Sequence, residues 1–160
     1  MTAELTTAEI ILRLVFAAAA GALVGIDREA RGKPAGFRTH ALVALGAALV
    51  TVCGIQSLRE AGADPAAVTR VIQGVIAGVG FLGGGAILHS RDHDAVTGLT
   101  TAATIWIVSA LGIACGGGHW VAVTTALVLV EFILILGRRV DVLLHKSRTP
   151  ERSDAQHATE

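Results

Sequence analysis

The chain has 160 residues, of which 52% are hydrophobic and only 16% charged, whereas an average soluble protein carries about 25% charged residues. Lysine and arginine together number 13, and so do aspartate and glutamate, which leaves a formal net charge of zero. These values exclude an ordinary soluble domain with a polar surface, and the lack of a net basic charge argues against a nucleic-acid-binding protein.

Five apolar runs of 17 or 18 residues follow one another along the chain: Ile10–Ile26, Ala41–Leu58, Val71–Leu88, Leu99–Cys115 and Val121–Gly137. A helix of this length, with its flanks, crosses the hydrocarbon core of a bilayer. Lipid requires each backbone polar group to be satisfied within its segment, and the runs lack the period-two alternation of barrel strands. The sequence therefore predicts an all-α fold, a polytopic membrane bundle of five transmembrane helices in residues 1–137. Residues 138–160 are predicted to form a short cytoplasmic tail, helical at first and mostly disordered.

Basic residues are unequally shared between the two sides that these spans define. The first connection, the third connection and the tail hold ten lysines and arginines, whereas the opposite side holds two, Arg59 and Arg70. Cytoplasmic loops of membrane proteins carry an excess of lysine and arginine. The sequence thus predicts an N-terminus outside and a C-terminus in the cytoplasm.

The first connection concentrates charge, with seven ionisable side chains in the fourteen residues from Asp27 to His40. Pro34 cannot continue a helix, and Gly36 is expected to permit the reversal of the chain. Thr39 is expected to cap the second helix. The segment therefore predicts a sharp cytoplasmic turn between the first two spans.

Two interpretations of this charged turn remain open. In the first, Asp27 or Glu29 folds back onto the N-terminus of the second helix or onto Arg38, which gives a salt-bridged re-entry turn. In the second, the turn is a binding surface at the membrane face for a cation or another protein. His40 is either a capping or packing residue or, because imidazole titrates near neutral pH, a pH sensor.

Two ionisable side chains, Arg13 and Glu131, lie inside the apolar runs, and Gln73 is a further polar residue expected within the membrane. Arg13 is close enough to the outer end of its run to extend to the membrane surface. Glu131 lies about 9 Å from the cytoplasmic end of the fifth run, so its carboxylate should face the bundle. Arg38 and His40 are its candidate partners, and the pair could be structural or part of a conduction or proton site.

Glycines and threonines suggest how the spans pack. Small residues four apart let helices approach closely, so the third run is predicted to be the packing centre of the bundle or of a homodimer. A cavity lined by unwound backbone is the alternative. The glycines concerned are Gly74, Gly78, Gly80, Gly83 and Gly84. Hydroxyls at the cytoplasmic end of the fourth run, on Thr97, Thr100, Thr101 and Thr104, are expected to bond back to helix carbonyls or across to a neighbouring helix.

Metal binding and catalysis can also be judged from the residue types. Magnesium needs only one or two protein carboxylates, and four lie near the membrane on the cytoplasmic side: Asp27, Glu29, Asp92 and Asp94. Nearby arginines compete for them, so Mg²⁺ remains a candidate ligand and no other cofactor is expected. No arrangement of nucleophile and base is present in the sequence, so we expect no enzyme activity.

Three stretches in order along the chain resemble the membrane domain of the MgtC/SapB family: GALVGIDREARGKPAGFRTHALVALGAAL, GVGFLGGGAIL and GLTTAATIWIVSALGIACG. The resemblance implies a bacterial inner-membrane protein with about five spans, linked to adaptation to low magnesium. It also implies a regulatory role through binding another membrane protein, such as an ATPase or ion pump, with magnesium or other ion transport as the alternative. The family's motif positions fall on Asp27, Arg28, Glu29, Lys33, Gly36, Arg38, Thr39 and His40.

The sequence departs from the family pattern in two ways. Many members have glutamate where this chain has Asp27, a mild change. The virulence proteins of the family carry a folded cytoplasmic domain after the last span, whereas 23 residues follow Gly137 here. We therefore expect a short form of the family, and functions that depend on that domain are not expected of it.

Overall fold

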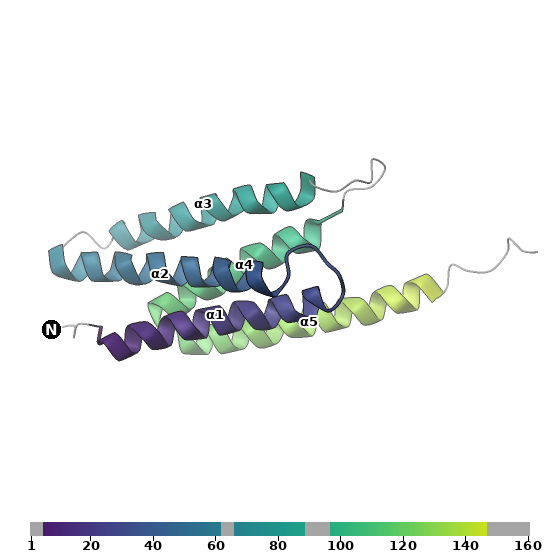
Figure 1. Ribbon diagram of the computed structural model, residues 1–160, viewed down its shortest axis with the longest axis horizontal. Coiled ribbons are helices and arrows are strands. Elements are labelled where there is room, and N and C mark those ends of the chain that lie inside the picture. Colours follow the sequence, from purple (N-terminus) through teal and green to yellow (C-terminus); the bar gives the residue numbers. More distant parts are fainter. Residues whose placement is uncertain (1–4, 62–65, 89–96, 147–160) are drawn as a thin grey trace, which may run out of the picture. The chain divides into compact units, whose positions relative to one another are not determined.

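The computed structural model describes residues 5–61, 66–88 and 97–146, and these form five helices without a strand. The helices are α1 (Thr7–Glu29), α2 (Phe37–Ala61), α3 (Ala66–Leu88), α4 (Leu99–Gly117) and α5 (Trp120–Lys146), as labelled in Figure 1. Each predicted apolar run lies within one helix, and all five helices are long and apolar enough to cross a membrane. The predicted all-α fold with five membrane-spanning helices is confirmed.

Helix α1 begins at Thr7 because Thr6, just before the helix, and Glu9, in its first turn, form a capping box. The Thr6 hydroxyl oxygen accepts a hydrogen bond from the Glu9 N–H at 3.2 Å, and the Glu9 carboxylate accepts one from the Thr6 N–H at 2.9 Å. These bonds satisfy two backbone donors that would otherwise lack partners at a helix start. The chain thus enters its first span with a defined helix end.

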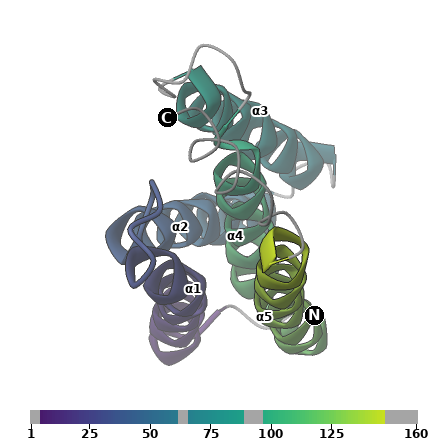
Figure 2. The ribbon, with the colours of Figure 1, turned by 90° about the vertical axis from the view of Figure 1, so that its right-hand side faces the viewer.

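Helices α1, α2 and α4 form a closely packed core of small residues. α1 and α2 lie side by side as an antiparallel pair, and α4 contacts α1, α2 and α3 (Figures 1 and 2). A Cβ atom added at Gly21 would lie 2.8 Å from the Cβ of Ala44, and one at Gly112 would lie 2.9 Å from that of Ala47. Such separations are too short for carbon atoms, so these glycines are what allows α2 to approach α1 on one side and α4 on the other.

Among α1, α2, α3 and α4, the third helix is not the packing centre, which differs from the prediction for the third run. A Cβ atom added at Gly83 would meet Ala102 of α4 at 3.5 Å, an ordinary contact. A Cβ atom added at the other four predicted positions would meet open space in the described structure: Gly74, Gly78, Gly80 and Gly84. Packing of α3 against a second copy remains a prediction.

The chain divides into two compact units, Met1–Leu127 and Val128–Glu160, with the boundary inside α5. Within the first unit, the rings of Trp120 and Phe16 meet edge to face with their centroids 5.5 Å apart. In the second unit α5 continues beyond Gly137 to Lys146. The predicted domain boundary at residue 137 and the disorder predicted for the end of the tail remain predictions, since residues 147–160 are outside the described residues.

Candidate functional site at the α1–α2 turn

The backbone of the α1–α2 turn reverses at two residues with positive φ, Gly32 at 62° and Ala35 at 56°. The expectation that Gly36 supplies this freedom is therefore wrong. Gly36 is needed for space instead, because a Cβ atom there would lie 2.7 Å from a carboxylate oxygen of Glu29. Pro34 lies between the two positive-φ residues, in the non-helical segment where its fixed φ is tolerated.

The two carboxylates of the turn have different partners. The Phe37 N–H, the first backbone donor of α2, bonds to the Glu29 carboxylate at 2.9 Å, so the predicted return of an acidic side chain to this helix end is confirmed for Glu29. Asp27 instead forms an ion pair with Arg31, one helical turn further along the chain. Thr39 is not the cap, because α2 starts at Phe37 and Thr39 is exposed within its first turn.

Arg28, between these carboxylates, is buried and joins α1 to α4. Its side chain is 5% exposed, and its guanidinium donates a hydrogen bond to the Thr101 hydroxyl. This is the predicted bond of a threonine hydroxyl across to a neighbouring helix, while Thr104 bonds back to the Thr101 carbonyl at 2.9 Å. Local spacing could not identify Arg28 as the donor, since 73 residues separate it from Thr101.

His40 of α2 lies in the same buried region and is fully buried. Its Nδ1 lies 2.9 Å from the Gly36 carbonyl oxygen, and because a carbonyl only accepts, Nδ1 carries the hydrogen. The Nε of Arg28 and the Nε2 of His40 are buried without a hydrogen-bond partner among the described residues. The Nε of Arg28 is a donor, and the Nε2 of His40 is an acceptor because Nδ1 carries the hydrogen. His40 is thus a packing residue of the helix junction in this structure, while the pH-sensing role remains untested.

The basic and hydroxyl side chains of the turn face outward. Lys33, Arg38 and Thr39 are exposed, and they line a hollow of about 360 Å³ together with Glu29, Gly32 and Gly36. Within the described parts of the chain, the side chains of Lys33, Arg38 and Thr39 have no hydrogen bond or ion pair. The motif residues of the turn therefore form two sets. The inner set, Arg28 and His40, is buried between the helices. The outer set, Lys33, Arg38 and Thr39, is exposed and available to a ligand.

The predicted intramembrane polar residues are found in three different settings. Arg13 does not simply extend toward the membrane surface, because its guanidinium donates to the Gly116 carbonyl at 2.7 Å and so stabilises the C-terminal end of α4. Gln73 is exposed on α3. Glu131 belongs to the second unit of the chain and its candidate partners to the first, so that pairing remains a prediction.

The two described carboxylates of the predicted magnesium set already have partners within the chain, and magnesium binding there remains a prediction. Asp27 is paired with Arg31, and Glu29 caps α2. Across residues 5–61, 66–88 and 97–146, no group of three or more histidine, cysteine, aspartate or glutamate residues could hold a metal ion. The other two predicted ligands, Asp92 and Asp94, are outside the described residues.

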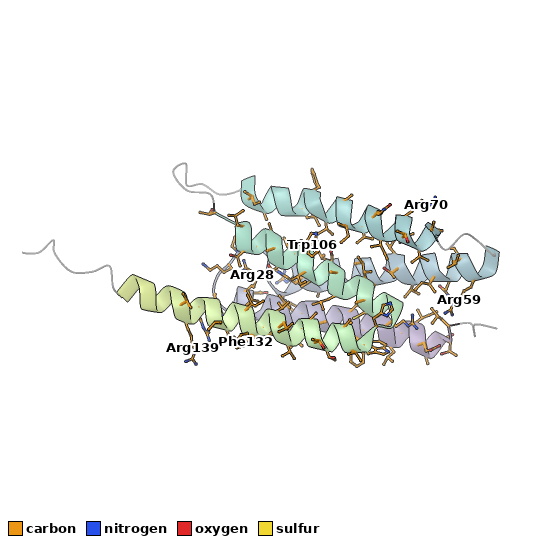
Figure 3. The ribbon with its side chains drawn as sticks, turned by 180° about the vertical axis from the view of Figure 1, so that it is seen from behind. Arg28, Arg59, Arg70, Trp106, Phe132 and Arg139 are labelled. Atoms are coloured by element: carbon orange, nitrogen blue, oxygen red, sulfur yellow. The ribbon has the colours of Figure 1, made fainter. Side chains whose placement is uncertain are left out.

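The arginines used to predict the topology lie at opposite ends of the helices. Figure 3 shows Arg28 at one end of the first unit, and Arg59 and Arg70 at the other end. In the described part of the chain, the turn and these two arginines therefore lie at opposite ends of the helices, as the count of basic residues assumes.

Comparison with known proteins places the chain in a family. A model of the MgtC family matches residues 14–143. The chain is 47% identical to protein SrpB of Synechococcus elongatus over 68% of its own length and 63% of SrpB. It is 38% identical to the putative magnesium transporter YhiD of Escherichia coli over 89% of its length and 69% of YhiD. It is 37% identical to protein MgtC of Salmonella typhimurium over 80% of its length and 52% of MgtC.

The chain thus spans between about half and two thirds of the length of these curated relatives. No solved structure matches it. The family match covers most of the chain, and it agrees with five helices that are apolar and long enough to cross a bilayer. This chain is a membrane protein that belongs to the MgtC family.

Proposed function

We propose that this protein is a regulatory protein of the bacterial inner membrane, which binds another membrane protein and takes part in magnesium homeostasis. In this proposal the α1–α2 turn faces the cytoplasm, as does the C-terminus. Membership of the MgtC family and the name of the Escherichia coli relative support the link to magnesium. The unequal distribution of lysine and arginine supports the orientation.

The observation that carries the proposal is the buried, largely apolar core of the described residues of the first unit. The buried hydroxyl of Thr51 donates to a carbonyl of its own helix at 2.8 Å, and that of Ser109 does so at 2.9 Å. The surrounding side chains are apolar and closely packed, among them Val52, Val108 and Leu111, which are at most 2% exposed. Mg²⁺ gives up its water shell reluctantly, and isolated hydroxyls among apolar side chains offer too few oxygen ligands to replace it. The core of the first unit therefore favours a structural scaffold over an ion path.

The surface offered to a partner is the outer set of the turn, Lys33, Arg38 and Thr39. Their exposure, and the positive charge of the first two, suit a partner with an acidic surface close to the membrane. By resemblance to the family, the partner would be a membrane ATPase or an ion pump. The buried residues Arg28 and His40, and the exposed Glu29 that caps α2, would act indirectly, by holding the turn in place.

Transport of magnesium is the second candidate, and the name of the Escherichia coli relative favours it. A transporter requires polar groups at mid-depth, and Glu131 on α5 is the carboxylate that could serve. Because Glu131 lies in the second unit, the apolar core of the first unit is no argument against an ion path at Glu131. Magnesium flux is the measurement that separates the two functions.

The proposal is tested by photo-crosslinking in native membranes, with a crosslinker in place of Thr39 and mass spectrometry of the captured proteins. We expect a specific membrane protein to be captured and Arg38→Gln to reduce its yield. Arg59→Gln is the matched control, since it removes the same charge from an exposed residue at the opposite end of the helices. Equal yields from both variants, with both present in the membrane at normal levels, would contradict the proposed surface.

A further inference from the structure

We propose that the hollow at the α1–α2 turn binds the phosphate group of an anionic phospholipid, whose acyl chain lies along the exposed face of α2. The inference rests on the proposed function only for the placement of the turn at the cytoplasmic leaflet, and it requires no protein partner. The ligand chemistry is a phosphodiester, and the source is a lipid of the surrounding bilayer.

The charges around the hollow favour a phosphodiester. Lys33 and Arg38 bring two positive charges and Thr39 a hydroxyl donor to one hollow of about 360 Å³. Glu29 is the acidic residue of the lining, and it already accepts the hydrogen bond from the Phe37 N–H. Because the ion pair of the neighbouring Asp27 is made with Arg31, the two exposed cations are left for an external anion.

The second observation is an apolar stripe that continues from the hollow along α2. Leu42, Gly46 and Leu49 follow Arg38 at intervals of four, four and three residues, which places all of them on one face of the helix. Leu42 is 67% exposed and Leu49 is 47% exposed, and a Cβ atom added at Gly46 would meet no described atom within 4 Å. The stripe therefore forms a shallow apolar path between two exposed leucines.

The length of this path matches one leaflet of a membrane. Eleven residues separate Arg38 from Leu49, and at about 1.5 Å per residue they span about 16 Å, close to half of the roughly 30 Å hydrocarbon core. A phosphate group bound at Arg38 would thus have its acyl chain alongside Leu42, Gly46 and Leu49 down to the bilayer centre. An acidic segment of a protein would account for the charge of the hollow but not for the apolar path below it, so the lipid is the better fit.

The test uses the purified full-length protein and native mass spectrometry with phosphatidylglycerol and phosphatidylcholine that carry identical acyl chains. We expect preferential retention of phosphatidylglycerol and a loss of about fivefold in its affinity for each cation removed in Lys33→Gln and Arg38→Gln. Arg59→Gln should leave retention unchanged. Equal retention of the two lipids by the unaltered protein would overturn the proposal.

The apolar half of the site is tested separately with Gly46→Leu, which fills the path without disturbing the turn. We expect this variant to fold, since the position is open and leucine favours a helix over glycine, yet to retain less phosphatidylglycerol. Gly74→Leu, at another open position on α3, is the control. Unchanged retention in Gly46→Leu would contradict the acyl-chain path.

Two further arms identify the source of the anion. Inorganic phosphate is added alone, and binding of equal strength to the same cations would show a free-anion site and overturn the lipid assignment. Lys33→Gln and Arg38→Gln are also carried through the crosslinking experiment in native membranes. Loss of a protein crosslink with unaltered lipid retention would assign the hollow to an acidic protein instead. Loss of lipid retention with an intact protein crosslink would support the lipid site and contradict the partner surface proposed at Arg38, so the two proposals fail separately.

Discussion

Replacement of Thr101 by valine tests whether the buried Arg28 holds α1 to α4. Valine keeps the shape of threonine but removes the acceptor of the guanidinium hydrogen bond, while Arg28 stays buried at 5% exposure. Hydrogen bonds to charged groups contribute about 1.5–3 kcal/mol, whereas hydrogen bonds between neutral groups inside membranes average about 0.6 kcal/mol. Because the donor is charged and the acceptor is lost while the donor remains buried, we expect a loss of about 2 kcal/mol in the free energy of unfolding.

The measurement is reversible unfolding of the purified protein in mixed micelles, followed by circular dichroism. Thr104→Val is the matched control, because Thr104 is also buried in α4 but its hydroxyl bonds to a carbonyl of its own helix. It should cost well under 1 kcal/mol. In a double-mutant cycle with Arg28→Met, the effect of Thr101→Val should largely disappear. Equal costs for the two valine variants, or additive costs in the cycle, would refute the role assigned to Arg28.

Three further predictions concern packing, the helix cap and orientation. Gly112→Leu should prevent normal folding, because an added Cβ would lie 2.9 Å from the Cβ of Ala47, and the measurement is loss of the monodisperse peak in size-exclusion chromatography. Gly84→Leu, at an open position, should fold. If α3 packs against a second copy, Gly84→Leu should also reduce dimer crosslinking. Glu29→Ala should lower the free energy of unfolding by about 1 kcal/mol through loss of the cap on α2, and amide exchange at Phe37 should speed up. In a variant without native cysteines, Lys33→Cys should react with an impermeant thiol reagent only after the cells are opened, and labelling of intact cells would contradict the proposed orientation.

Sequence patterns were sufficient for the five helices but not for the residues that hold them together. The length and apolar character of a run are local properties, and lipid leaves a helix as the structure for each. Contact faces are not local. Glycines four apart occur in the third run, but also at Gly21 and Gly25 and at Gly112 and Gly116, and only the structure distinguishes the pairs that meet a neighbouring helix. Spacing shows that close approach is feasible, not where it takes place.

The turn was predicted in outline and differs in detail for a related reason. A threonine near a helix start suggested Thr39 as the cap, yet Glu29 supplies it from eight residues away and α2 begins two residues before Thr39. The bond from Arg28 to Thr101 joins residues far apart in the sequence, so no local pattern predicts it. One local signal was available and unused: Thr6 and Glu9 have the spacing of a capping box.

Magnesium flux into liposomes that contain the purified protein is the most direct test of the claim that the protein is a regulator and not a transporter. With a magnesium-sensitive dye inside and a gradient of Mg²⁺ across the membrane, the proposed function predicts flux equal to that of protein-free liposomes, and no change on Glu131→Gln. Flux well above this background that is abolished by Glu131→Gln would contradict the proposal and assign the protein to transport.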